Sequence, residues 1–147
     1  MGLNDTRTEA ARGLVERHYR DRAALAAELA EFRAEHGLQT WPDQHVIVHA
    51  EWCTEGVWCR DRISRCVFDL PIPVELMGRL MDWVDYFERW DPLFGETLTR
   101  EESAAVCEDF AGEGEVIAED LRRALPGWTV VYIDPRKSLA HLFAAPS

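Results

Sequence analysis

PIPVELMGRLMDWVDYFERW, residues 71–90, is the stretch that decides the fold of this chain. Pro73 suits a first helical position, and a step of about 100° per residue from there spreads the apolar side chains over more than half of the circumference. Because so wide an apolar arc has to be covered on two sides, we predict a helix at the centre of the core, with Trp83 buried. The predicted polar side of this helix carries Glu75, Arg79, Asp82, Asp85, Tyr86 and Arg89.

Length and composition predict one domain over residues 1–147. A chain of 147 residues with 47% hydrophobic content can bury roughly 70% of the surface that its unfolded form exposes. The sequence has no export-signal pattern, and no apolar run approaches the ~18 residues that span a bilayer, so we expect a cytoplasmic protein without a membrane partner. Four cysteines in this context indicate reduced thiols rather than a disulfide framework.

The negative charge is concentrated in one part of the sequence. From Asp82 to Asp120 there are thirteen acids and two bases, whereas the rest of the chain has fourteen of each sign. The formal net charge of −11 therefore lies within about a quarter of the sequence. This argues against a nucleic-acid or anionic-membrane partner and favours a cationic protein. The alternative is that these carboxylates are only the solvated faces of helices in an acidic protein.

A long helix is predicted at the N-terminus. It begins at the capping-box pair Thr6 and Glu9 and ends at Gly37. About 30 residues make a rod of ~45 Å, which exceeds the ~38 Å diameter expected for a domain of this size. We therefore expect either a bend near residues 20–22 or projecting first turns. The predicted stripe is Ala11, Val15, His18, Leu25, Leu29, Phe32 and His36. We interpret its two histidines as residues of the stripe edge or the last turn rather than as metal ligands.

Three antiparallel strands are predicted before the central helix. The first runs from Gln44 to Trp52 and has strong β-formers at its centre. A short turn containing Gly56 leads to a return strand, and a second turn leads to a third strand, Ile63 through Leu70. Alternation places one face of the first strand inward: Val46, Val48, Ala50 and Trp52.

The other face of the first strand suggests an enzyme as an alternative. His49, Glu51 and Cys53 follow one another there at alternate positions. A thiol, an imidazole and a carboxylate on one surface could act as a nucleophile and an acid-base pair, although only the tertiary structure can place a Cys-His pair. The competing interpretation is that Cys53, Cys59 and Cys66 are small, semi-apolar side chains that fill the sheet.

A metal site on the same face is possible only with help from other elements. His45 and His49 lie ~13 Å apart along an extended strand, whereas each zinc ligand must approach the metal within ~2.0–2.3 Å. Cys59, Cys66 or Cys107 could complete a site, but the sequence has no C-x-x-C pair. We therefore predict four free thiols, no metal and no cofactor.

A third helix is predicted from a second capping box, formed by Thr99 and Glu102. It ends at Pro126-Gly127, and glycines at 112 and 114 suggest a bend or a close approach to another element. Its expected buried stripe is Cys107, Phe110, Gly114, Ile117 and Leu121.

The last predicted strand runs from Trp128 to Asp134. It is apolar on both faces, which indicates an interior position in the sheet. Ser138 to Ala145 then forms either a short helix or a hairpin strand. The fold class we predict is a single α+β domain, with an antiparallel sheet of three to four strands packed against long N-terminal, central and third helices.

One pattern resembles that of small bacterial immunity proteins of polymorphic toxin systems. It covers about residues 57 to 134, and most of its positions are core positions. The resemblance implies an α+β fold and an interaction protein, and it transfers no catalytic residues. Its positions are Leu70-Pro71-Ile72-Pro73, Leu76, Leu80, Trp83, Phe87, Gly114, Leu121, Leu125, Trp128, Val130 and Tyr132.

The leading functional hypothesis is a non-catalytic, immunity-type inhibitor that occludes a cationic toxin or effector domain. Its acids would steer association, and Tyr86 is our candidate for the buried anchor. Two alternatives stay open: a phosphate mimic that occupies the groove of a nucleic-acid-binding protein, and an enzyme or metal-binding protein that uses the His49, Glu51 and Cys53 face. The expected partner-binding residues are Asp82, Asp85, Tyr86, Glu108, Glu115 and Glu119.

Overall fold

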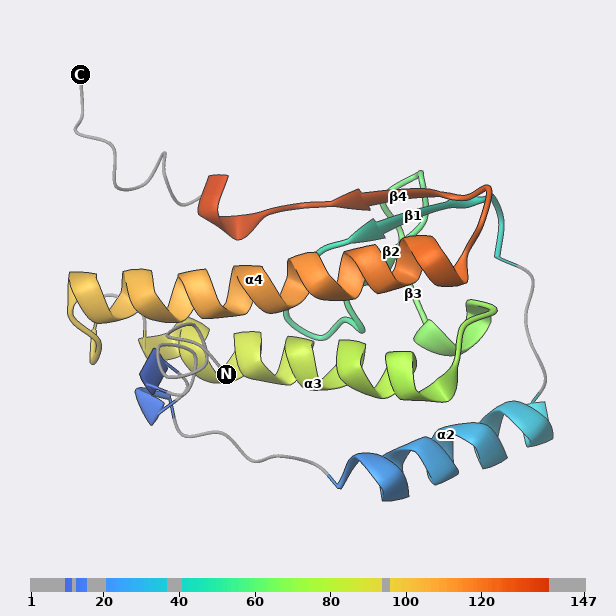
Figure 1. Ribbon diagram of the computed structural model, residues 1–147, viewed down its shortest axis with the longest axis horizontal. Coiled ribbons are helices and arrows are strands. Elements are labelled where there is room, and N and C mark those ends of the chain that lie inside the picture. The colour runs from blue at the N-terminus through green and yellow to red at the C-terminus, as the bar shows by residue number, and fades with distance from the viewer. Residues whose placement is uncertain (1–9, 12, 16–20, 37–40, 94–95, 138–147) are drawn as a thin grey trace.

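The computed structural model of the protein describes residues 10–11, 13–15, 21–36, 41–93 and 96–137. Figure 1 shows a sheet lying against two long helices, α3 and α4, with a further helix, α2, on the side of α3 that faces away from the sheet. This arrangement confirms the predicted α+β class. The elements are α2 (Arg22–His36), β1 (His45–Val48), β2 (Val57–Trp58), β3 (Ser64–Arg65), η1 (Val67–Asp69), α3 (Val74–Trp90), η2 (Asp91–Leu93), α4 (Arg100–Ala124) and β4 (Thr129–Tyr132).

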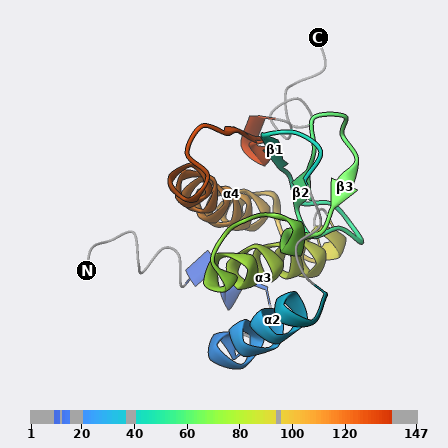
Figure 2. The same cartoon turned by 90° about the vertical axis from the view of Figure 1, so that its right-hand side faces the viewer.

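The predicted central helix is α3. It runs antiparallel to α4, and α2 covers another of its sides (Figures 1 and 2). Trp83 is 1% exposed, which confirms its predicted burial. Its ring stacks on Phe110 of α4, with ring centroids 4.6 Å apart, and its indole N–H donates to the Phe110 carbonyl oxygen over 2.9 Å.

The polar side of α3 is narrower than the sequence predicted, because α2 and α4 each cover part of it. Asp82, expected on the surface, is 4% exposed, and Arg22 of α2 donates to its carboxylate over 3.3 Å. Tyr86, also expected on the surface, is fully buried, and its hydroxyl donates to Asp109 of α4 over 2.9 Å. The predicted exposure of both residues is therefore wrong.

The N-terminal helical tract is interrupted near residue 21, within the region where a bend was expected. The Asp21 carboxylate accepts hydrogen bonds from the backbone N–H groups of Ala23 and Ala24, at 3.1 and 3.2 Å, and so caps α2. Residues 10, 11 and 13 are helical. Of the predicted stripe, Ala11, Val15 and Leu29 are buried and Phe32 is 42% exposed. Thr6, Glu9, His18 and Gly37 lie outside the described residues.

The predicted hairpin and third strand form, although each strand is shorter than expected. β1 pairs antiparallel with β2, and β2 with β3. Val46, Val48 and Ala50 face the core as predicted. Trp52 is 46% exposed and the prediction for it is wrong, because β1 ends at Val48 and a turn follows, in which Cys53 has a φ of 61°.

β4 corrects two predictions about the sheet. It lies at one end of the strand order β3-β2-β1-β4, so it is an edge strand of the described sheet and not an interior one. It pairs parallel with β1, which makes the sheet mixed rather than antiparallel. The reason is visible in Figure 1, where α3 and α4 return the chain to the end of the sheet at which β1 begins.

α4 matches its prediction closely. Thr99 and Glu102 form both hydrogen bonds of the capping box, and all five residues of the predicted stripe are buried. At the other end of β4, Asp134 accepts from the backbone N–H of Arg136 over 2.9 Å, and residues 135–137 are helical. The segment Ser138 to Ala145 lies outside the described residues. No helix in the described part of the chain is both long and apolar enough to cross a bilayer.

Candidate functional site

The exposed side of α4 carries three of the acids that the sequence singled out. Glu108, Glu115 and Glu119 have side chains that are 61%, 59% and 55% exposed. Val116, which follows Glu115 in the chain, is 54% exposed. Positions 108, 115, 116 and 119 recur at helical spacing and so share one side of the helix. We refer to Glu108, Glu115, Val116 and Glu119 as the α4 acidic face.

The α4 acidic face has a cation of its own, which the sequence pattern did not indicate. Arg136, beyond β4, lies 3.4 Å from Glu108, 3.4 Å from Glu115 and 2.7 Å from Asp134. Its hydrogen bond holds the pKa of Asp134 below its usual range and raises the pKa of Arg136. Glu119 pairs with Arg122 one turn along the helix. Since ion pairs of exposed carboxylates contribute only ~0–1 kcal/mol, the contacts of Glu108, Glu115 and Glu119 can be exchanged at small cost.

The structure does not bring the α3 candidates to this surface. Asp82 is 4% exposed and Tyr86 is fully buried, so neither side chain forms part of the exposed surface. Asp85 is half-buried. Of the six predicted partner-binding residues, the three on α4 therefore remain the best exposed.

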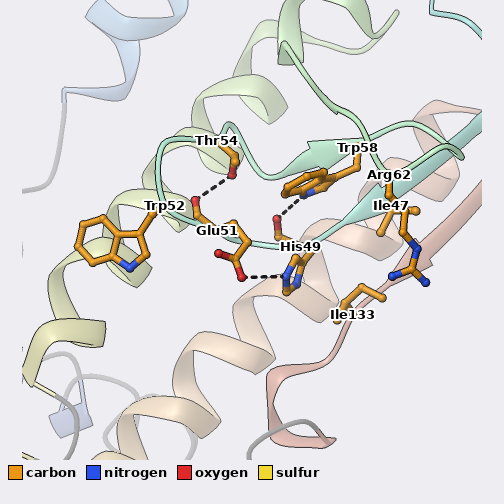
Figure 3. Close-up of a pocket in the computed structure, with 8 residues that line it drawn as sticks. All are labelled: Ile47, His49, Glu51, Trp52, Thr54, Trp58, Arg62 and Ile133. Carbon is orange, nitrogen blue, oxygen red and sulfur yellow. Dashed lines mark hydrogen bonds and ion pairs between the residues drawn. The ribbon is translucent and has the colours of Figure 1, made fainter.

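A second site, which is concave, lies on the open face of the sheet (Figure 3), the face opposite the helices. It is a pocket of about 420 Å³. Within it the imidazole Nε2 of His49 lies 3.3 Å from the Glu51 carboxylate, so the structure does bring these two predicted residues together. Figure 3 shows Trp52 and Arg62 at opposite ends of the pocket. The lining residues are Ile47, His49, Glu51, Trp52, Thr54, Trp58, Arg62 and Ile133.

Hydrogen bonds to the side chains hold the pocket walls in place. The Trp58 indole N–H donates to the His49 carbonyl oxygen over 2.9 Å, and the Trp52 indole N–H donates to Asp91 over 2.8 Å. The Thr54 hydroxyl donates to the Glu51 carbonyl oxygen over 2.8 Å. Aromatic walls with a few fixed polar groups are typical of binding pockets.

Cys53, the third residue of the predicted His49, Glu51 and Cys53 strand face, is not among the residues that line the pocket. β1 ends at Val48, and Cys53 stands in the turn beyond it with a φ of 61°. Arg62 and Ile133 line the pocket without having been predicted, because the β2–β3 turn and the end of β4 reach it only through the sheet pairing. Among the described residues, no group of three or more His, Cys, Asp or Glu side chains could hold a metal ion.

All four cysteines lie in the described part of the chain and are free thiols. Cys59 and Cys107 are buried, whereas Cys53 and Cys66 are exposed, so the prediction that Cys53 and Cys66 fill the sheet is wrong. Partial desolvation and the neighbouring Glu55 carboxylate raise the pKa of the Cys66 thiol to about 11. Burial, with Glu108 and Asp134 nearby, raises the pKa of Cys107 to about 11 as well.

We expect thiol labelling of the native protein at pH 8 to be led by Cys53. At that pH roughly one Cys66 thiol in a thousand is the reactive thiolate, and burial protects Cys59 and Cys107 from the reagent. Labelling of Cys66 should accelerate about tenfold per pH unit up to its pKa. Mass spectrometry of labelled peptides against time measures each rate, and denaturation should expose four thiols. Equal native rates at all four cysteines, or fewer than four thiols after denaturation, would contradict this assignment.

Comparison with known protein families assigns the sequence to one family. Searches of curated proteins and of solved structures found no match. A family model described as Serratia CdiI immunity protein-like matches residues 44–135, which contain the whole sheet, α3 and α4. The match covers more than half of the chain and confirms the resemblance to immunity proteins of toxin systems. The chain belongs to the Serratia CdiI immunity protein-like family.

Proposed function

We propose that this protein is a non-catalytic immunity-type inhibitor that binds a toxin domain and occludes a cationic surface on it through the α4 acidic face. The observation that carries the proposal is the position of that face. It lies within the span matched by the family model, and its three glutamates and one valine project from a helix whose opposite side is anchored in the core.

The charge distribution supports a cationic partner. α4 carries eight acids and three bases, and two of those bases stand in its last turn. A surface potential of this sign accelerates encounter with a basic protein and repels nucleic acid and anionic membranes. In this proposal the internal ion pairs of Arg136 and Arg122 hold the glutamate side chains in place until a partner's basic groups replace them.

In this proposal Val116 replaces Tyr86 as the apolar anchor of the interface. Interfaces combine a less polar centre with a polar rim. Val116 lies at one edge of the α4 acidic face, about 60° around the helix from Glu119, and is 54% exposed, whereas Tyr86 is fully buried. Val116 is thus the apolar contact that the proposed interface offers at the edge of its glutamates.

Reversing charges on the α4 acidic face should slow association with the partner. In the double variant Glu115→Lys/Glu119→Lys we expect an association rate at least about tenfold lower at 50 mM salt, with a flatter salt dependence, because long-range attraction is lost. The partner is the protein that co-purifies with the wild-type chain. Stopped-flow or surface-plasmon-resonance measurements between about 50 and 500 mM salt give the rates.

A matched control distinguishes the effect of the α4 acidic face on association from the effect of the total charge. Glu75→Lys/Glu96→Lys makes the same change in net charge at exposed positions off the α4 acidic face. We expect its association rate to stay within about threefold of wild type. If both double variants slowed association equally, or if neither did, the α4 acidic face would be no more than a solvated surface.

A further inference from the structure

A groove separate from both sites above lies between α2, η1 and α3. It has a volume of about 390 Å³. Its floor is apolar and three glutamates of α2 stand on it or at its rim. The lining residues are Leu25, Glu28, Leu29, Glu31, Phe32, Glu35, Phe68 and Met81.

The α2 wall of this groove is a regular helical stripe. Leu25, Leu29 and Phe32 follow at steps of four and three residues, and Glu28 and Glu35 stand three residues after Leu25 and Phe32, which places all five on one side of the helix. The stripe repeats after seven residues: Leu25 corresponds to Phe32, and Glu28 corresponds to Glu35. Leu25 and Leu29 of this stripe pack against the core beside α3, whereas Glu28 and Glu35 are exposed.

The aromatic part of the groove is held in position yet remains accessible. The Phe32 ring packs on Phe68 of η1, with centroids 4.5 Å apart, and on His36, at 4.2 Å. Phe32 is nevertheless 42% exposed, and Leu29 is the one residue of α2 that is fully buried. Leu25 is half-buried against the core, so among the apolar side chains of this stripe Phe32 is the one left accessible to a partner.

The charged groups that line the groove are all negative. Arg22 is turned to Asp82 of α3, and the guanidinium of Arg33 donates to the carbonyl oxygens of Ile72 and Leu70. The basic side chains at both ends of α2 are thus engaged by the protein itself. Glu28, Glu31 and Glu35 make no ion pair with any residue that the structure describes.

We propose that this groove binds a basic amphipathic helix of a partner protein, with leucine-like side chains on the Leu25 and Phe32 floor and lysine or arginine opposite the three glutamates. Phe32 offers an apolar contact to such a helix, and the three exposed glutamates recur over two turns of α2, so a helix lying along α2 can present basic side chains at matching intervals. The negative charge of the glutamates disfavours anionic lipid and nucleic acid. α2 ends before residue 44, where the match to the family model begins, so the groove is built partly by an element outside that match. The inference does not depend on the α4 acidic face.

The test uses a synthetic helical peptide of about four turns, made of leucine and lysine at amphipathic spacing and labelled with fluorescein. Fluorescence anisotropy with the full chain at about 0.15 M salt gives the dissociation constant. We expect binding at least about tenfold tighter than that of a peptide with the same composition in scrambled order. Phe32→Ala should weaken binding about tenfold, and Glu28→Gln/Glu35→Gln several-fold.

Glu75→Gln/Glu96→Gln is the control, because it removes the same charge at exposed positions away from the groove. It should change the dissociation constant by less than about twofold. If the scrambled peptide bound equally well, or if the control weakened binding as much as the groove variants, the binding would be general attraction to an acidic protein and the proposal would fall. Circular dichroism checks folding, and the glutamate double variant decides the outcome should Phe32→Ala fail to fold.

Discussion

Trp83→Ala should lower the free energy of unfolding by about 3–5 kcal/mol. The indole is 1% exposed and stacks on Phe110 with an angle of 7° between the rings. The substitution leaves a cavity between α3 and α4 and removes the indole hydrogen bond to the Phe110 carbonyl oxygen. A domain usually has only ~5–15 kcal/mol of stability, so this loss is a large share of it.

Urea or guanidinium denaturation followed by circular dichroism measures the effect, and Trp52→Ala is the matched control. Trp52 has the same side chain but is 46% exposed at the mouth of the sheet-face pocket. Its truncation should cost less than about 1 kcal/mol. An unchanged denaturation midpoint in Trp83→Ala would show that the packing of α3 on α4 does not stabilise the protein as the structure indicates.

Gly114→Ala should destabilise the protein by about 1–3 kcal/mol, even though alanine is the better helix former. A Cβ at this position would lie 2.5 Å from the Tyr132 hydroxyl oxygen and 2.6 Å from a ring carbon of Trp83. Neither neighbour can easily move away, since the Tyr132 hydroxyl donates to the Ala111 carbonyl oxygen and the Trp83 indole to that of Phe110. The added methyl group therefore separates α4 from α3 and β4.

Gly112→Ala should stabilise the protein, which is the opposite of the effect expected for Gly114→Ala. It lies in the same helix, half-buried, and a Cβ there would have no neighbouring atom within 4 Å. The gain in helix propensity should then raise the free energy of unfolding by up to about 1 kcal/mol. The two variants are compared by thermal and denaturant unfolding. A stabilised Gly114→Ala would mean that the contact between α4 and the Trp83-Tyr132 pair is looser than described.

Features that depend on neighbours along the chain could be predicted from the sequence. The capping box of Thr99 and Glu102 lies within one turn, and the buried stripe of α4 is a period within one helix. The same holds for the inward face of β1, where Val46 and Val48 alternate with half-exposed residues. The prediction of an exposed acidic face on α4 succeeded for the same reason, because the side opposite a buried stripe is the side left to solvent.

The candidate sites were predicted only in part. His49 and Glu51 belong to one short segment, so their proximity follows from the sequence, whereas Arg62 and Ile133 reach the same pocket through strand pairing. Arg136 is distant along the chain from the glutamates that it pairs with. Nothing in a periodicity argument could have assigned a cation to that acidic face.

The sequence by itself determined the α+β class, the extent of α3 and α4 and the burial of Trp83, because helix ends and amphipathic periods are encoded by residues within a few positions of one another. Only the tertiary structure decided that Asp82 and Tyr86 lie inside and that β4 is a parallel edge strand. A helical period gives the direction of each side chain around its own axis, but whether a polar direction meets water or another helix depends on which elements become neighbours in space.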